Sequence, residues 1–139
     1  MNLPRPADLT SLVLRTDFTD ASVWSAVREA LHADDRHVSA TCVSDPRFDG
    51  VSVQALTADE PGANEDDPVT ALFLADCVTM ADPAYPLLAV DLADQPGRTF
   101  RVAARHFHDV SANLSIANMD FADFADAADE TGTYRGFGE

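Results

Sequence analysis

Short apolar runs recur along the chain and are separated by polar, turn-forming segments. A brief apolar run, or one in which apolar and polar residues alternate, is typical of a β-strand. The turn sequence at 94–97 (DQPG) separates the last two such runs, which we expect to pair as an antiparallel hairpin. Strands are predicted at 11–15 (SLVLR), 37–43 (HVSATCV), 69–75 (VTALFLA), 87–90 (LLAV) and 99–103 (TFRVA).

Two further segments repeat apolar residues at the spacing of one helical face. The first follows Thr19 or Asp20, whose side-chain oxygens can accept the free N–H groups at a helix start. The second covers residues 110–128 and is expected as two consecutive helices, the later one capped by Asn118 or Asp120. The first helix should bury one stripe of side chains, which comprises Val23, Trp24, Val27, Ala30 and Leu31.

The segment at 51–58 fits either of two structures. Val51 and Val53 alternate like strand residues, whereas Ser52 can cap a short helix that buries Val53 and Leu56, and we favour the helix. The order of elements is then β-α-β-(α)-β-β-β-α. This alternation favours an α/β fold, with helices packed on a mixed, partly parallel sheet of about five strands. The first strand–helix–strand unit should be parallel.

The composition limits the classes of protein that fit the chain. Its 139 residues, of which 46% are hydrophobic, are enough for a single globular domain over 1–139. A loose N-terminal arm is expected at 1–10 and a mobile acidic loop at 59–68. No apolar run is long enough to span a bilayer and no secretory signal is visible, so we expect a cytoplasmic protein. Cys42 and Cys77 lie in apolar segments and are expected as buried, reduced thiols.

The charge is strongly negative. The chain has 24 Asp and Glu against 9 Arg and no Lys, which gives a net charge of −15. Such a field opposes binding to nucleic acid or to an anionic membrane surface, because both need clustered positive charge. It favours solubility, a cationic ligand or a basic protein partner.

Three stretches resemble a known family. They are SLVLRTDFTD at 11–20, NLSIANMDFADFAD at 113–126 and YRGF at 134–137. Together they resemble an uncharacterised family, a domain of unknown function, of small acidic domains from high-GC actinobacteria. The resemblance implies a single intracellular domain and assigns no catalytic residue.

An aspartate follows each of three predicted strands, namely Asp17, Asp76 and Asp91. Ligands bind outside the carboxyl ends of parallel strands in open α/β sheets, and carboxylates placed there can hold Mg²⁺. The alternative is that these residues cap turns, since Asp is the commonest polar residue of the chain. The metal interpretation requires the three carboxylates to converge.

A basic island interrupts the acidic sequence and contains Arg98, Arg101, Arg105, His106 and His108. On a strand, Arg101 and Arg105 would share one face, where guanidinium groups can bind the phosphate or carboxylate of a small ligand. The alternative is that these arginines neutralise neighbouring aspartates. The two histidines would point the same way on a strand and resemble half of a metal site.

These observations favour a non-catalytic acidic interaction or regulatory module that binds a basic protein partner, and an enzyme is the less favoured interpretation. No cofactor is expected for that module. Two alternatives stay open. One is a small metal-dependent hydrolase that uses the strand-end aspartates, for which Mg²⁺ is the candidate metal. The other is a small anionic-ligand binder that uses a strand from Arg98 to Arg105. The sequence does not predict the oligomeric state.

Overall fold

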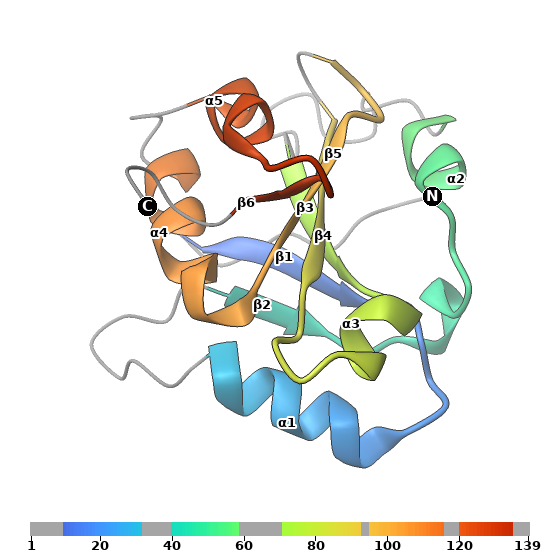
Figure 1. Cartoon of the computed structure of the whole chain (residues 1–139). Helices are drawn as coiled ribbons and strands as arrows, with labels where there is room; N and C mark the ends of the chain where they lie inside the picture. Colours follow the sequence, from blue (N-terminus) through green and yellow to red (C-terminus); the bar gives the residue numbers. More distant parts are fainter. Residues whose placement is uncertain (1–9, 32–39, 59–70, 93–94, 116–119, 135–139) are drawn as a thin grey trace.

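The computed structural model describes residues 10–31, 40–58, 71–92, 95–115 and 120–134. The expected acidic loop at 59–68 and the expected N-terminal arm, apart from Thr10, lie outside the described residues. Within them the predicted α/β class is confirmed, because one mixed sheet carries helices on both of its faces (Figure 1).

Within the described residues, the sheet has six strands in the order β2-β1-β3-β4-β5-β6. Of the described strands, β4 alone runs antiparallel to its neighbours, and all other pairs are parallel. β1 lies at the point where the chain changes direction across the sheet, with β2 on one side and β3 on the other. The strands are β1 (Ser11–Arg15), β2 (Ala40–Val43), β3 (Ala71–Ala75), β4 (Leu87–Asp91), β5 (Thr99–Val102) and β6 (Thr133–Tyr134).

Where the structure describes them, the predicted strands match β1 to β5, with ends that differ by one residue at β4 and β5. The first crossover is parallel and β4 pairs with β5 antiparallel, and both relationships were expected from the sequence. The sixth strand was not predicted, because β6 has two residues and gives no alternating pattern. Its Tyr134 is nevertheless buried.

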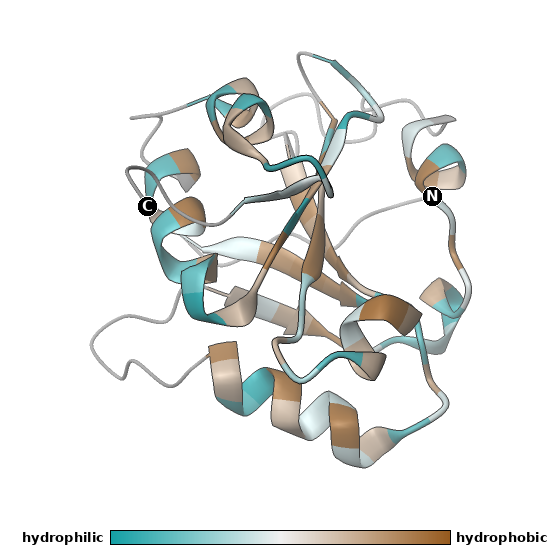
Figure 2. Cartoon of the chain, in the orientation of Figure 1, coloured by the Kyte–Doolittle hydropathy of each residue, from teal (hydrophilic) through white to brown (hydrophobic). Residues whose placement is uncertain are grey.

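One face of the sheet packs against α1 (Ala21–Leu31), α4 (Ala104–Ser115) and α5 (Phe121–Ala127). The cap of α1 is Asp20, as predicted, since its Oδ1 accepts hydrogen bonds from the N–H groups of Ser22 and Val23 at 2.9 and 3.3 Å. Trp24, Val27 and Leu31 are buried, as the helical stripe predicts. Figure 2 shows the hydrophobic residues on the strands and in bands along the helices that cover them.

The opposite face of the sheet packs against η1 (Pro46–Phe48) and α2 (Val53–Ala58). Phe48 and Leu56 cover Leu12, Leu14, Leu72 and Leu74 of the central strands. The hydroxyl of Ser52 accepts a hydrogen bond from the N–H of Ala55 at 3.1 Å. The predicted short helix with a serine cap is therefore confirmed for the ambiguous segment at 51–58.

Two helical features differ from the prediction. α4 begins at Ala104 rather than near residue 110, because Ala104, Phe107 and Val110 are buried at helical spacing against the sheet. α3 (Cys77–Ala81) was not predicted, and it has only five residues. It begins with a capping box in which Asp76 and Thr79 satisfy each other's N–H groups.

Candidate functional site

Asp17 and Asp76 lie at the same end of the sheet, just beyond the C-terminal ends of two adjacent strands. They follow β1 and β3, which are parallel neighbours with Arg15 opposite Ala75. The Oδ1 atom of Asp17 accepts hydrogen bonds from the hydroxyl and the N–H of Thr19 at 2.6 and 2.9 Å. These bonds, helped by the charge of Arg15, hold the pKa of Asp17 below its ordinary value.

Asp91 does not join this pair. It ends β4, and because β4 runs antiparallel to β3, Asp91 lies opposite Ala71 at the other end of the sheet. Its side chain is buried, and its Oδ2 accepts a hydrogen bond from the N–H of Gln95 at 2.9 Å. The expected convergence of three strand-end carboxylates is therefore wrong. Among the described residues, no group of three or more His, Cys, Asp or Glu is arranged to hold a metal ion. Magnesium binding by Asp17 and Asp76 stays a prediction.

Asp76 is engaged by Arg101 of β5. The guanidinium donates from Nη1 to Oδ1 and from Nη2 to Oδ2, both at 2.8 Å. Arg101 also donates to the carbonyl oxygen of Pro86 at 3.3 Å. Burial raises the pKa of Asp76, but the hydrogen bonds from Arg101 and Thr79 outweigh it, so the pKa lies below its ordinary value. Both carboxylate oxygens of Asp76 are thus committed to protein donors.

The three predicted arginines do not form one anion-binding strand. β5 ends at Val102, and Arg105 belongs to α4. Arg98 donates to Gln95 at 2.9 Å and forms an ion pair with Asp126 of α5. For Arg98 and Arg101 the contacts therefore match the alternative in which arginines neutralise aspartates. Arg105 differs from both, since its side chain is exposed and has no carboxylate partner among the described residues.

The two histidines lie on α4 rather than on a strand, so they do not point the same way. The ring of His106 lies edge-on to Tyr134, with centroids 6.3 Å apart. His108 faces a cleft on the other side of the helix. The expected half of a metal site at this pair is not formed.

Arg15 is a buried cation that sequence reasoning missed. Its side chain donates to the carbonyl oxygen of Asp17 at 3.1 Å and to the hydroxyl of Ser44 at 3.2 Å. Its guanidinium carbon lies 4.4 Å from the ring centre of Phe18 and 5.8 Å from that of Trp24. These contacts join the ends of β1 and β2 to the start of α1. The available signal was an arginine that ends an otherwise apolar strand sequence.

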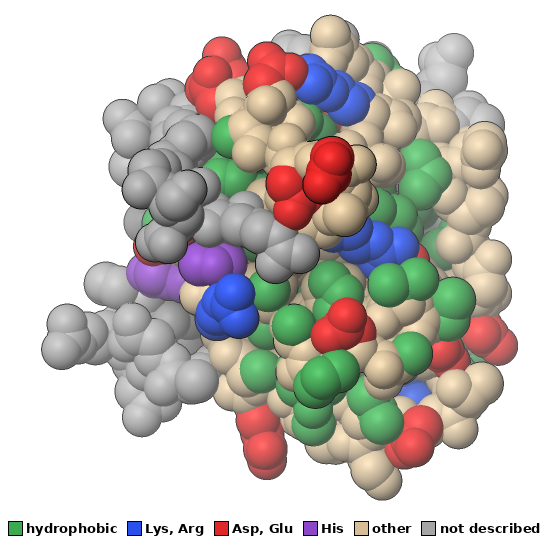
Figure 3. Space-filling model, viewed as in Figure 1, with side chains coloured by type: hydrophobic (Ala, Val, Ile, Leu, Met, Phe, Trp, Pro, Cys, Tyr) green, Lys and Arg blue, Asp and Glu red, His purple; other side chains and the backbone are tan. Residues whose placement is uncertain are grey.

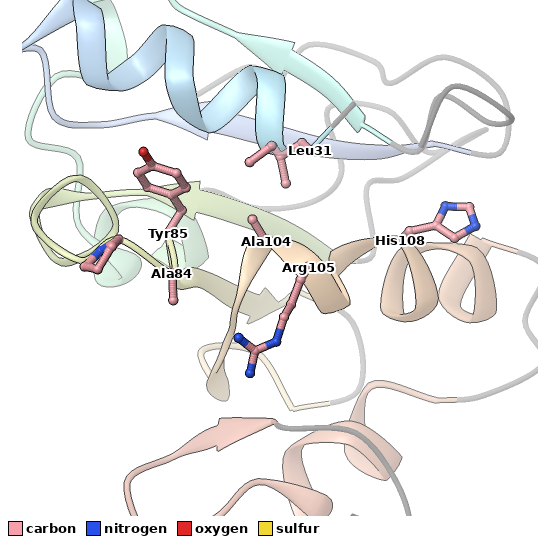
Figure 4. Close-up of a pocket in the computed structure, with 8 residues that line it drawn as sticks. Leu31, Ala84, Tyr85, Ala104, Arg105 and His108 are labelled. Atoms are coloured by element: carbon pink, nitrogen blue, oxygen red, sulfur yellow. The ribbon is translucent and has the colours of Figure 1, made fainter. Parts of the chain in front are cut away.

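A cleft opens between the C-terminal end of α1, the segment that joins α3 to β4, and the first turns of α4 (Figure 4). Its volume is about 540 Å³. The side chains of Leu31 and Ala104 point toward one another across it, and Tyr85 stands at one side (Figure 4). The residues that line it are Ala30, Leu31, Pro83, Ala84, Tyr85, Ala104, Arg105 and His108.

Tyr85 holds an uncommon backbone conformation at the wall of this cleft. Its φ is 49°, in the left-handed region that residues other than glycine rarely adopt. Its N–H donates to the carbonyl oxygen of Asp82 at 2.9 Å, and the N–H of Ala104 donates to the carbonyl oxygen of Ala84 at 3.1 Å. These bonds fix the segment against α4. Sequence reasoning missed Tyr85, and its signal was an aromatic residue in a short loop between Pro83 and Pro86.

A second surface is strongly acidic. α5 buries Phe121 and Phe124 against Phe100 and Tyr134 of the sheet and turns its polar side to solvent. Figure 3 shows acidic side chains gathered over α5 and the turn that precedes β6. The exposed carboxylates of this acidic surface are Asp120, Asp123, Asp126, Asp129 and Glu130.

Comparison with known proteins gives a family. Residues 10–137 match the model of a protein family described as a domain of unknown function, DUF6924. No curated protein matches the chain. Within the part of the chain that the structure describes, no helix combines the length and the apolar character needed to cross a membrane.

Proposed function

Since the chain belongs to the DUF6924 family, whose description names no activity, we propose from its geometry that it is a ligand-binding module. The cleft between α1, α4 and the α3–β4 segment is the observation that carries this proposal. Its volume of about 540 Å³ falls in the range of small-molecule sites. Its walls are mainly apolar, with a few polar groups at the rim, which is the usual chemistry of such sites.

The apolar walls favour a ligand with an apolar body. Leu31 and Ala104 face one another but are nearly buried, so the apolar surface that a ligand would remove from water belongs mainly to the more exposed lining residues, Ala30, Pro83, Ala84 and Tyr85. Tyr85 adds an aromatic edge that is partly exposed. A left-handed backbone at a non-glycine residue is more common at functional sites than elsewhere, and it supports a role for this segment.

The proposal is tested by titrating ¹⁵N-labelled protein with 4-phenylbutan-1-ol, a neutral probe with an aromatic body, and recording NMR spectra. We expect amide shifts confined to Leu31, Ala84, Tyr85 and the first turns of α4. Ala104→Leu places a larger side chain in the cleft and should weaken these shifts several-fold. Ala122→Leu, the same change on α5, is the control and should leave them unchanged. Shifts that are absent, scattered, or insensitive to Ala104→Leu would count against the cleft.

A second candidate function is the binding of a basic protein partner, and the acidic surface over α5 favours it. Five exposed carboxylates gather on this surface, and Arg98 forms an ion pair with one of them, Asp126. A net charge of −15 adds a long-range attraction for cations. Complementary charge of this kind speeds encounter and selects partners.

This second function is tested with a labelled arginine-rich peptide at two salt concentrations. We expect binding at low salt that weakens as salt screens the charges. The variant Asp126→Asn/Glu130→Gln should weaken it more than Glu29→Gln/Asp49→Asn, which removes the same charge from exposed positions elsewhere. Equal losses in the two double variants, or no binding at low salt, would rule out the α5 surface.

A further inference from the structure

We propose that the ligand of the α1–α4 cleft is a small carboxylate with an apolar body, whose charge is recognised by Arg105. This inference rests on the proposed function, because it names the chemistry of the ligand at the same cleft. It predicts that the cleft prefers this anion to neutral and cationic molecules of the same shape. It also gives Arg105 a role that the other arginines of the basic island do not share.

The charge of the residues that line the cleft differs from that of the protein as a whole. The chain has 24 Asp and Glu against 9 Arg, yet the described residues that line the cleft include no carboxylate. The side chains with nitrogen at its rim are Arg105 and His108. In a protein with a net charge of −15, this rim therefore offers an anion side chains that carry nitrogen.

Arg105 is available to a ligand. Among the described residues its polar partner is His106, since the Nε–H of Arg105 donates to the ring Nε2 of His106 at 3.3 Å. Arg98 and Arg101, in contrast, are committed to Asp126 and Asp76. The two Nη groups of a guanidinium can bind a carboxylate through two parallel hydrogen bonds.

The position of Arg105 on α4 adds to the attraction. α4 has twelve residues and begins at Ala104, and its first turn contains no acidic residue. The N-terminal end of a helix carries a partial positive charge, which disfavours cations and favours anions nearby. The N–H of Ala104 is already bonded to Ala84, so the contribution of the helix is its field rather than that hydrogen bond.

The view into the cleft shows how Leu31, Ala104 and Arg105 lie (Figure 4). Leu31 and Ala104 form the apolar part, while Arg105 leaves α4 on the side away from Leu31 (Figure 4). The apolar body would lie against Leu31 and Ala104, and the carboxylate at the rim, where the exposed Arg105 side chain can turn to meet it. Asp82 and Asp109 lie close in sequence to the rim, so a single negative charge suits the site better than a dianion.

The test compares three probes that share one body and differ in charge, namely 4-phenylbutyrate, 4-phenylbutan-1-ol and 4-phenylbutylamine. Their dissociation constants are measured by NMR titration of the full chain at low salt. We expect the carboxylate to bind about fivefold tighter than the alcohol, the scale of an exposed ion pair, and the amine to bind weakest. This order is the reverse of the one that the net charge alone would produce.

Two variants test whether Arg105 is the residue that recognises the carboxylate. Arg105→Gln should abolish the preference for the carboxylate over the alcohol. Arg47→Gln makes the same change in η1, on the opposite face of the sheet, and should keep the preference.

The outcomes separate the inference from the proposed function. If the alcohol binds as well as the carboxylate, or the amine binds best, the inference falls and the cleft remains a ligand site. If Arg105→Gln keeps the preference, another group recognises the anion and the inference falls. If none of the three probes binds, the proposed function fails as well.

Discussion

Arg101 and Asp76 form a two-point ion pair although β3 and β5 are not neighbours in the sheet. Arg101 lies within β5, Asp76 follows β3, and β4 runs between them. The same guanidinium donates to the carbonyl oxygen of Pro86, just before β4. The Arg101 side chain therefore connects β5 to the segment that follows β3 and to the segment that precedes β4.

Arg101→Gln is expected to lower the free energy of unfolding by about 2 kcal/mol, because it leaves a half-buried carboxylate without its charged partner. The side chains of the pair are 21% and 22% exposed, so solvent screens it incompletely. Urea denaturation followed by circular dichroism measures the loss. Arg47→Gln breaks the more exposed pair with Asp45 and should cost less than about 1 kcal/mol. Equal losses in the two variants would contradict this account.

The same ion pair predicts how stability depends on pH. The pKa of Asp76 lies below its ordinary value of 3.8 in the folded protein, so the folded state binds this proton less tightly than the unfolded state. The stabilisation is fully present above that ordinary value and is lost as the pH falls through the lower, folded value. Because many carboxylates titrate in this range, the readout is the difference between wild type and Asp76→Asn. That difference in urea midpoint should shrink between neutral pH and about pH 3. A constant difference would contradict the prediction.

Thr79 has a fully buried hydroxyl whose loss should be costly. Its Oγ1 donates to the carbonyl oxygen of Pro86 at 2.7 Å and lies 3.1 Å from Oδ1 of Asp76. Thr79→Val keeps the shape and removes the hydroxyl, so we expect a loss of about 2 kcal/mol in unfolding free energy. Thr79→Ser keeps the hydroxyl and should lose less than half as much. Thermal and urea unfolding compare the two, and a valine variant as stable as the serine variant would refute the argument.

The two cysteines should differ in reactivity. Cys77 is exposed, which corrects the expectation that both thiols are buried. Burial raises the pKa of Cys42 to about 11, so this thiol stays protonated near pH 8 and reacts slowly. With a chromogenic disulfide reagent we expect one fast thiol in the native protein and two in denaturant. Cys77→Ser should abolish the fast phase, and a fast phase that survives would show that Cys42 is accessible.

Much of the fold could be predicted because local patterns and tertiary packing agree. The stripe from Trp24 to Leu31 and the capping residues Asp20 and Ser52 are local signals, and the structure uses them as expected. α4 was placed too late, because the polar sequence from Arg105 to Asp109 hides the buried Phe107. α3 and β6 are too short to show a hydrophobic period in the sequence, so they can be recognised only from their contacts in the structure.

The candidate site was harder to predict, because it depends on strand direction and on segments far apart in sequence. The prediction for Asp91 assumed that β4 was parallel, and its reversal moves the carboxylate to the opposite end of the sheet. The sequence predicts anion binding by Arg105 on a strand, but the structure places Arg105 on α4, and its neighbours in the cleft come from α1 and the α3–β4 segment. Spacing within one segment cannot show such neighbours.

The reversed direction of β4 also bears on the order in which the protein folds. β3, β4 and β5 follow one another and pair as a meander, so their contacts close short loops of chain. β1 instead pairs with β3 across a long excursion, and the hydroxyl of Ser11 bonds to that of Ser111, 100 residues away. Since the entropy lost on closing a loop grows with its length, the meander should assemble early. The first strand of the chain would then be among the last to take its place at the centre of the sheet.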